Sequence, residues 1–388
     1  MGGKSYSQLR FMEKVSIIVT SYNNSHNLEH CIESLINQNY DKNIIDLEII
    51  FVDSGSTDSS IDVLNRYKNR IKAVLKPQKT LRLSPAMARN IGVENARGDV
   101  LIFTDSDCIL PQDWVQNMVD CFKDPRIDCV IGSREPDFGE GLGSFMRRYD
   151  FILYSNKFTI SEKLLINTKS IREGVPLILL SGNNFAIKKE LWNKLGGMKS
   201  VFKNPAGEDI MLETEIIKNN GNILFCPENK IKHIHPISLK DFFRKSIQWS
   251  EATYLLGKYS DGFVTWRNFA ERGHILNMGE FSIYVLFIVL ILLIAIFLKI
   301  SPYAIVAFFI IMFLYFYIGK LTYIDRRLKS ILNLKGENYK RNYDLPLLKL
   351  FYFSLLHLLM NFLTSINFLL CIIKDKYAII TNGFGEKR

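Results

Sequence analysis

Short apolar runs rich in β-branched residues recur in the N-terminal part of the chain, and each run ends in a polar loop. The runs at 15–20, 47–52 and 99–104 have the length and composition of buried strands. Helical patterns at 27–38 and 86–96 lie between them. Because strands alternating with helices favour parallel pairing, the sequence predicts an α/β fold with a mostly parallel sheet.

Acidic residues follow two of these apolar runs. Asp53 ends the second strand, and Asp105 and Asp107 follow the run at 99–104. Ligands bind beyond the carboxyl ends of the strands in such sheets, so these carboxylates are expected to face one crevice. Paired carboxylates suit a hard divalent cation, Mn²⁺ or Mg²⁺. An Asp-X-Asp pattern alone is a weak signal, because aspartates are common in loops.

The C-terminal part of the chain has a different composition. Two nearly uncharged stretches, 281–298 and 301–318, are each close to the length that crosses a bilayer, and Pro302 fits the start of a second helix after a tight turn. The predicted organisation is a globular domain over 1–260, a linker over 261–280, a transmembrane hairpin over 281–318, a basic cytoplasmic loop over 319–346, a third membrane or interfacial helix over 347–373 and a basic tail over 374–388. A buried soluble hairpin is the alternative.

The charges favour a membrane partner over a nucleic acid. The formal net charge is +10, but Lys and Arg are scattered and form no dense run interleaved with aromatic residues. The basic 319–346 segment follows the hairpin, which by the positive-inside tendency places it and the globular domain in the cytoplasm. Residues 1–13 have no secretory signal core, and the six cysteines form no CxxC pair, so we expect reduced thiols. The expected location is the cell membrane, multi-pass, with the globular domain cytoplasmic.

An ordered series of motifs resembles a known family. In chain order, the motifs lie at 15–24, 51–58, 88–92, 103–107, 181–187, 195–197 and 207–209. Together they resemble the inverting family-2 glycosyltransferases, whose catalytic domain has the Rossmann-like GT-A fold of nucleotide-diphospho-sugar transferases. The similarity covers about residues 14–260. It implies a GT-A catalytic domain that uses a nucleotide-sugar donor, with a UDP-sugar as the first expectation and a GDP-sugar as the alternative.

The resemblance also implies roles for individual residues. Asp53 would bind the nucleotide base, Arg89 the phosphates, and Gly182, Asn183 and Asn184 the donor sugar. Asp105 would lie near the ribose and the cation, whereas Asp107 would ligate the cation directly. His233 or His235, on one face of an expected strand, would be a further metal contact. Plain structural roles, such as a turn aspartate, a surface arginine or a core histidine, remain the alternatives.

The acceptor hydroxyl needs a general base, and Asp209 is the first candidate. Glu208 is the second candidate and could instead orient the acceptor or Asp209. Both residues open a predicted helix, so simple capping of its dipole is the alternative.

The expected activity is transfer of a single sugar to a lipid-linked or glycan acceptor at the cytoplasmic membrane face. Processive synthases of this family carry a QxxRW signature, whereas this chain has Arg244 ahead of Gln248 and Trp249. That departure disfavours polymer extrusion. A sugar nucleotidyltransferase on a similar fold and a non-catalytic membrane scaffold that binds glycans are the competing hypotheses.

Overall fold

The computed structural model describes residues 13–75, 82–135, 162–172, 180–234 and 239–260, with the single positions 367, 370, 371 and 374. The chain divides into two compact units, residues 1–137 with 161–235 and residues 138–160 with 236–388. The predictions for His235, the linker, the membrane hairpin and the basic loop lie outside the described residues, as do those for the third apolar helix and the tail apart from the four single positions. Among the described residues, no helix has the length and hydropathy needed to cross a bilayer.

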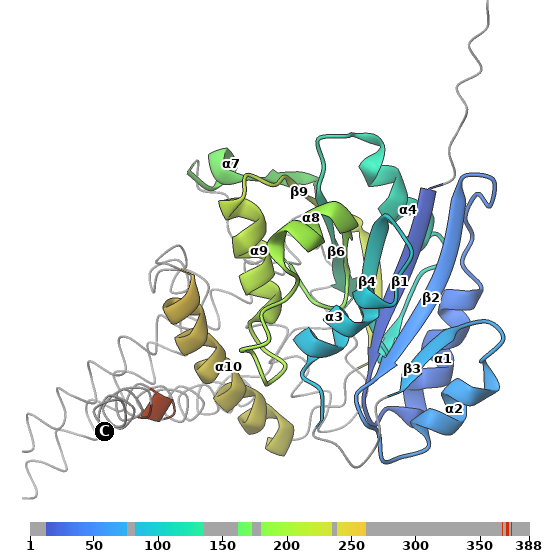
Figure 1. Cartoon of the computed structure of the whole chain (residues 1–388), viewed down its shortest axis with the longest axis horizontal. Helices are drawn as coiled ribbons and strands as arrows, with labels where there is room; N and C mark the ends of the chain where they lie inside the picture. The colour runs from blue at the N-terminus through green and yellow to red at the C-terminus, as the bar shows by residue number, and fades with distance from the viewer. Residues whose placement is uncertain are drawn as a thin grey trace, which may run out of the picture. The chain divides into compact units, whose positions relative to one another are not determined.

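One sheet forms the centre of the first unit (Figure 1). Its strands are β1 (Glu13–Ser21), β2 (Ile45–Asp53), β3 (Lys72–Leu75), β4 (Val100–Asp105), β5 (Cys108–Ile109), β6 (Cys129–Glu135), β7 (Leu164–Ile166), β8 (Phe185–Lys188) and β9 (Ile223–His233). They are ordered β3-β2-β1-β4-β8-β6-β9-β5, and β7 pairs with β9. The pairings show that β1, β2, β3, β4, β6 and β9 run in one direction, whereas β5, β7 and β8 run in the other. The sheet is therefore mostly parallel, as predicted.

Helices cover both faces of this sheet. They are α1 (Ser25–Ile36), α2 (Ser60–Arg66), α3 (Pro85–Glu94), α4 (Trp114–Asp120), α7 (Thr168–Arg172), α8 (Lys189–Leu195) and α9 (Glu208–Lys218), with a 3-10 turn, η1, at Cys121–Lys123. On one face, Gly92 of α3 lies against Ile18 and Val52, so that a larger residue there would collide with the strands. On the same face, Trp192 of α8 stacks on Phe103 of β4. The remaining helix, α10 (Leu239–Tyr259), belongs to the second unit.

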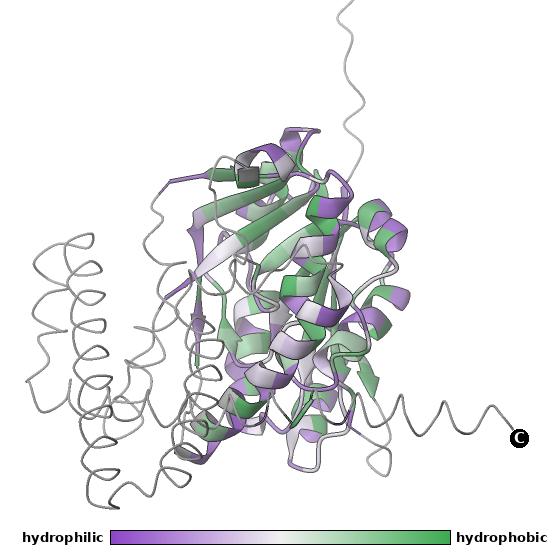
Figure 2. Ribbon diagram, turned by 90° about the vertical axis from the view of Figure 1, so that its left-hand side faces the viewer, coloured by the Kyte–Doolittle hydropathy of each residue, from purple (hydrophilic) through white to green (hydrophobic). Residues whose placement is uncertain are grey.

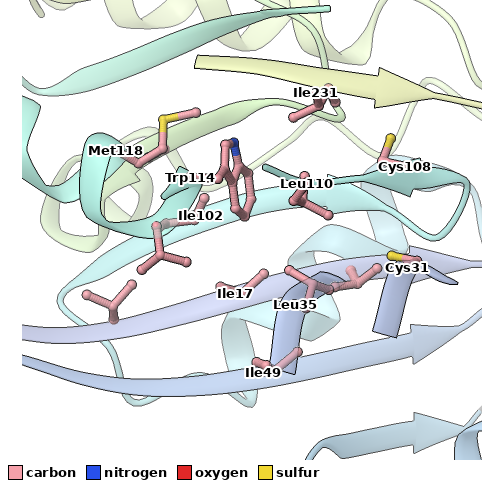
Figure 3. Packing of buried hydrophobic residues seen from close by; sticks show 14 of the residues in the cluster. Ile17, Cys31, Leu35, Ile49, Ile102, Cys108, Leu110, Trp114, Met118 and Ile231 are labelled. Carbon is pink, nitrogen blue, oxygen red and sulfur yellow. The ribbon is translucent and has the colours of Figure 1, made fainter. Parts of the chain in front are cut away.

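A hydrophobic cluster lies on the opposite face, between the sheet and α1, α2 and α4. Figure 3 shows Leu35 of α1 and Trp114 of α4 packed among strand residues such as Ile17 and Ile102. In β1, alternate residues point to opposite faces, as the pleat requires. In Figure 2 the helices carry both hydrophilic and hydrophobic residues, as expected for helices with one buried side.

The structure confirms the predicted strands and helices up to β4. Further strands and helices follow β4 in the same unit. Neither β6 nor β8 was predicted from the sequence. The strand expected to carry His233 is β9, which already begins at Ile223. Pro227 lies inside β9, and a proline normally argues against a strand. Here the β6–β9 register shifts between Gly132 and Ser133, so an irregularity accommodates the proline.

Candidate active site

Arg89 contacts two residues that lie far apart in the sequence, Asp105 at the carboxyl end of β4 and Glu208 at the start of α9. Its Nη2 donates to Asp105 Oδ1 at 3.0 Å, and its Nη1 donates to Glu208 Oε1 at 3.0 Å. The Arg89 side chain is only 3% exposed. A buried guanidinium needs carboxylate partners, so this contact fixes the end of β4 against the start of α9. The predicted residues Arg89, Asp105 and Glu208 therefore form one cluster.

The charges in this cluster shift the pKa of both Arg89 and Glu208. Burial lowers the pKa of the Arg89 guanidinium, but the carboxylates of Asp105, Glu208 and Asp209 more than compensate and leave it above its ordinary value. Burial, followed by the nearby charge of Asp209, raises the pKa of Glu208 from 4.5 to about 7, although Arg89 opposes the shift. A carboxyl group that titrates near neutral pH is a feature of functional sites.

Two atoms of the cluster lack a partner within the described part of the chain. They are Glu208 Oε2 and Arg89 Nε, and both are buried. An unsatisfied buried polar atom is unfavourable unless water or a ligand reaches it. The arrangement is therefore suited to receiving a polar molecule beside Glu208.

Asp209 lies next to the loop before β8. Its Oδ2 accepts from the backbone N–H of Gly182 at 3.2 Å, and its Oδ1 accepts from the N–H of Ile210. A Cβ added to Gly182 would lie 2.5 Å from Arg89 Nη2, so only glycine lets this loop approach the guanidinium. The helix α9 starts at Glu208, after Gly207 with a φ of 87°. The prediction that Glu208 and Asp209 open a helix is confirmed.

Asp107 pairs with His233 at the end of the sheet. Asp107 Oδ2 and His233 Nε2 are 3.2 Å apart. Cys108 is the backbone partner of His233 in the antiparallel pairing of β5 with β9. One ligand atom from each of Asp107, Cys108 and His233 lies within 4.8 Å of the others. Burial raises the pKa of the Cys108 thiol well above its ordinary value, and sulfur is a softer ligand than these hard cations prefer. The carboxylate and imidazole are thus the groups here that suit Mn²⁺ or Mg²⁺.

Asp53 is held by its own loop. Its Oδ1 accepts from the N–H groups of Gly55 and Ser56 at 3.0 and 2.8 Å, and Ser56 Oγ donates to Oδ2. The side chain is fully buried. This geometry is the turn-stabilising alternative considered for Asp53, and contact with a nucleotide base stays a prediction.

Asn183 and Asn184 lie in different surroundings from those of Gly182. The Asn184 side chain is fully buried, where it accepts from Trp114 Nε1 and donates to the carbonyls of Ser133 and Asn229. Its amide is therefore committed to joining α4, β6 and β9. Asn183 is also buried, and its Oδ1 accepts from Ser181. These side chains shape the loop that presents Gly182, and direct sugar contacts stay predictions.

Two residues that were not among the predicted site residues position the cluster. Thr20 Oγ1 donates to Asp105 Oδ1 at 2.6 Å, and Asn90 exchanges two hydrogen bonds with the backbone of Met198. Thr20 ends the first apolar run, and Asn90 follows Arg89 within the motif at 88–92. Their places in the motifs were visible, but their partners lie too far away in the sequence to be inferred.

Comparisons with known proteins show what this chain is similar to. A model for the family described as glycosyl transferase family 2 matches residues 16–192. A Haemophilus influenzae protein described as an uncharacterized glycosyltransferase is 37% identical over 246 residues, which are 63% of this chain and 88% of that protein. The likeness to that relative covers nearly its whole length.

Other relatives match over shorter parts. A poly(ribitol-phosphate) beta-glucosyltransferase of Bacillus spizizenii is 31% identical over 166 residues, which are 41% of this chain and 26% of that enzyme. The chain thus spans about a quarter of that relative's length. The solved structure of the mannosyltransferase PcManGT from Pyrobaculum calidifontis, in complex with GDP-Man and Mn²⁺, has a TM-score of 0.45 and 20% identity, and the match covers 63% of each chain.

Proposed function

Because this chain belongs to glycosyl transferase family 2 and is a glycosyltransferase, we propose that it transfers a single sugar from a nucleotide-sugar, with inversion, to a lipid-linked or glycan acceptor. The observation that carries the proposal is the Arg89 contact with both Asp105 and Glu208. It brings the acidic end of β4, expected to face the donor, beside the carboxylates at the start of α9. A donor and an acceptor then meet at one edge of the sheet.

A divalent cation fits the residues at the end of β4. Asp107 and His233 supply one oxygen and one nitrogen ligand, and Asp105 lies two residues before Asp107. Mn²⁺ and Mg²⁺ complete such partial protein sites with water and phosphate oxygens. When bound, the cation would stabilise the negative charge on the departing nucleoside diphosphate. Asp107 and His233 would hold it, with Asp105 as a further candidate ligand.

Asp209 is the proposed general base. One of its oxygens accepts from Gly182 N–H, so the carboxylate is held beside the loop that would border the donor sugar. Its task is to accept the proton of the acceptor hydroxyl as that oxygen attacks the anomeric carbon. Glu208 is fixed through Arg89 and would orient the acceptor or Asp209. Loss of the nucleoside diphosphate from the opposite side of the sugar inverts the anomeric configuration.

The test of this function is product analysis with the full chain. The purified protein, in detergent, is incubated with UDP-sugars and GDP-sugars in the presence of Mn²⁺, Mg²⁺ or a chelator, with extracted membrane lipids as acceptors. We expect cation-dependent release of one nucleoside diphosphate and one added sugar in the lipid fraction, with inverted configuration by NMR. Release of no nucleoside diphosphate from any donor with either cation would contradict the proposal.

We propose further that the enzyme acts at the cytoplasmic face of the cell membrane. The support is the pair of apolar stretches at 281–298 and 301–318 and the basic segment that follows them. The expected result is that the full chain sediments with membranes after an alkaline carbonate wash, whereas a chain ending at residue 280 is released. Release of the full chain by the same wash would remove the membrane assignment and leave the transfer reaction untouched.

A further inference from the structure

Two cysteines from distant parts of the first unit lie in contact. Cys121 begins η1 directly after α4, and Cys226 lies within β9. Their Sγ atoms are 3.2 Å apart, and all six cysteines are free thiols. Cys121 is partly exposed, whereas Cys226 is buried. Sulfur atoms at this separation need to move by only about 1 Å to reach the bond length of a disulfide.

The surroundings make the two thiols unequal. The hydrogen bond from Cys226 lowers the pKa of Cys121, with burial opposing it and the charge of Lys163 assisting it. The pKa of Cys226 is raised by that same hydrogen bond and by burial. Lys163 is held nearby by an ion pair with Glu228, 2.9 Å between Nζ and Oε1. A partly exposed thiol with a lowered pKa next to a second thiol is the arrangement expected of an oxidation-responsive pair.

We propose that Cys121 and Cys226 form a reversible disulfide, with a small-molecule disulfide as the oxidant and Cys121 as the attacking thiol. The Cys121 thiolate attacks one sulfur of the oxidant, which forms a mixed disulfide and releases the first small thiol. Cys226 Sγ then attacks Cys121 Sγ, and the Cys226 proton passes to the departing small thiolate, which leaves as the second small thiol. The protein pair loses two electrons and two protons, and the oxidant is reduced to two thiols.

The disulfide would connect two of the three elements that hold Asn184, α4 and β9. Trp114 of α4 donates to Asn184 Oδ1 at 2.9 Å, and Asn184 Nδ2 donates to the carbonyl of Asn229 in β9 at 2.8 Å. Cys121 directly follows α4, and Cys226 lies three residues before Asn229. Drawing the sulfur atoms together would therefore shift α4 and β9 where they hold Asn184. Asn184 lies in the loop that carries Gly182.

The first experiment detects the bond itself. The full chain is equilibrated with mixtures of oxidised and reduced glutathione, quenched with an alkylating reagent, digested and examined by mass spectrometry. We expect one cross-linked peptide pair containing Cys121 and Cys226, lost again in reduced glutathione, while the buried Cys31, Cys108 and Cys129 stay reduced. Alkylation of both Cys121 and Cys226 at every ratio, or a glutathione adduct on Cys121 that Cys226 never displaces, would overturn the proposal.

The second experiment tests the effect on the loop and needs no substrate. Hydrogen exchange is compared between the reduced and oxidised protein, with Cys121→Ser and Cys226→Ser as matched controls that cannot form the bond. We expect exchange of the 181–187 peptide to change by about fivefold or more on oxidation of the natural chain, and to stay the same in both controls. Unchanged exchange in the cross-linked protein would overturn the coupling. Because neither readout uses a nucleotide-sugar, failure of the proposed transferase function would leave both results interpretable.

Discussion

Asp53 and Glu208 are both buried carboxyl groups at the ends of structural elements, but their surroundings differ. Asp53 accepts hydrogen bonds on both oxygens from Gly55 and Ser56 of its own loop. Glu208 Oε1 accepts a hydrogen bond from Arg89, whereas its Oε2 has no partner in the described part of the chain. The comparison shows that burial alone does not mark a reactive group. A carboxylate satisfied by its own loop stabilises the fold, whereas Glu208 keeps an acceptor atom that the described fold does not use.

The largest effect is expected at Asp209, beside Glu208. Asp209→Asn keeps the size and one of the two hydrogen bonds from Gly182 and Ile210 but removes the proton acceptor, so kcat should fall by about 10²–10⁴. The measurement is steady-state release of nucleoside diphosphate with the active donor. Thermal unfolding should stay close to that of the natural chain, which separates a lost base from a lost fold. A turnover equal to that of the natural chain would exclude Asp209 as the base.

The next effect concerns the guanidinium that connects the two sides of the site. Arg89→Met should lower the free energy of unfolding by about 3–5 kcal/mol, because it leaves buried carboxylates without their cation. The measurement is chemical denaturation at neutral pH. Arg66→Met is the control, since its ion pair with Glu29 is exposed and should contribute less than about 1 kcal/mol. Equal losses of unfolding free energy in the two variants would show that the buried ion pairs contribute no more to stability than the exposed one.

The pH dependence of stability tests whether Glu208 is held differently from an ordinary carboxyl group. Its folded-state pKa of about 7 exceeds the ordinary 4.5, so the folded protein binds the proton more tightly than the unfolded chain. This contribution is complete below pH 4.5 and is lost as the pH rises through about 7. It amounts to on the order of 3 kcal/mol.

Denaturation across that range should therefore show that the stability of the natural chain falls relative to that of Glu208→Gln as the pH rises. Parallel curves for the two proteins would mean that Glu208 titrates as a solvated side chain does.

The smallest effect is expected for the loop after β2. Asp53→Ala removes three hydrogen-bond acceptor contacts and should lower the free energy of unfolding by about 1–3 kcal/mol. Asp62→Ala, at an exposed position in the first turn of α2, is the control and should change it by less than about 0.5 kcal/mol. The comparison fails if Asp53→Ala unfolds at the same denaturant concentration as the control.

Much of the first half of the fold could be predicted because its signals are local. Each apolar run that precedes Asp53 or Asp105 forms a strand and ends where polarity begins, as the structure confirms. The opening of a helix at Glu208 was likewise visible in the sequence. The local pattern was sufficient there because a buried parallel strand needs a run of apolar residues and the start of a helix favours acidic residues.

Other features depend on contacts between distant residues. Arg89 and Glu208 are 119 positions apart, and no pattern in the chain shows that they form an ion pair. The same applies to Cys121 and Cys226, which are separated by 105 positions and have no characteristic spacing. Only four residues make up β8, too few to display a period. In each case the tertiary structure supplies the information.

The reversed direction of β8 has a consequence for engineering. Since β6 and β8 are antiparallel neighbours, the connection from Glu135 to Phe185 leaves and re-enters the sheet at one edge, the edge where β4 ends at Asp105. That connection includes β7, which pairs with β9, and the loop with Gly182 and Asn184, so a replacement has to keep both for the strand registers and the site to stay intact. A chimera that takes only residues 136–161 from a relative is therefore expected to keep every described strand pairing.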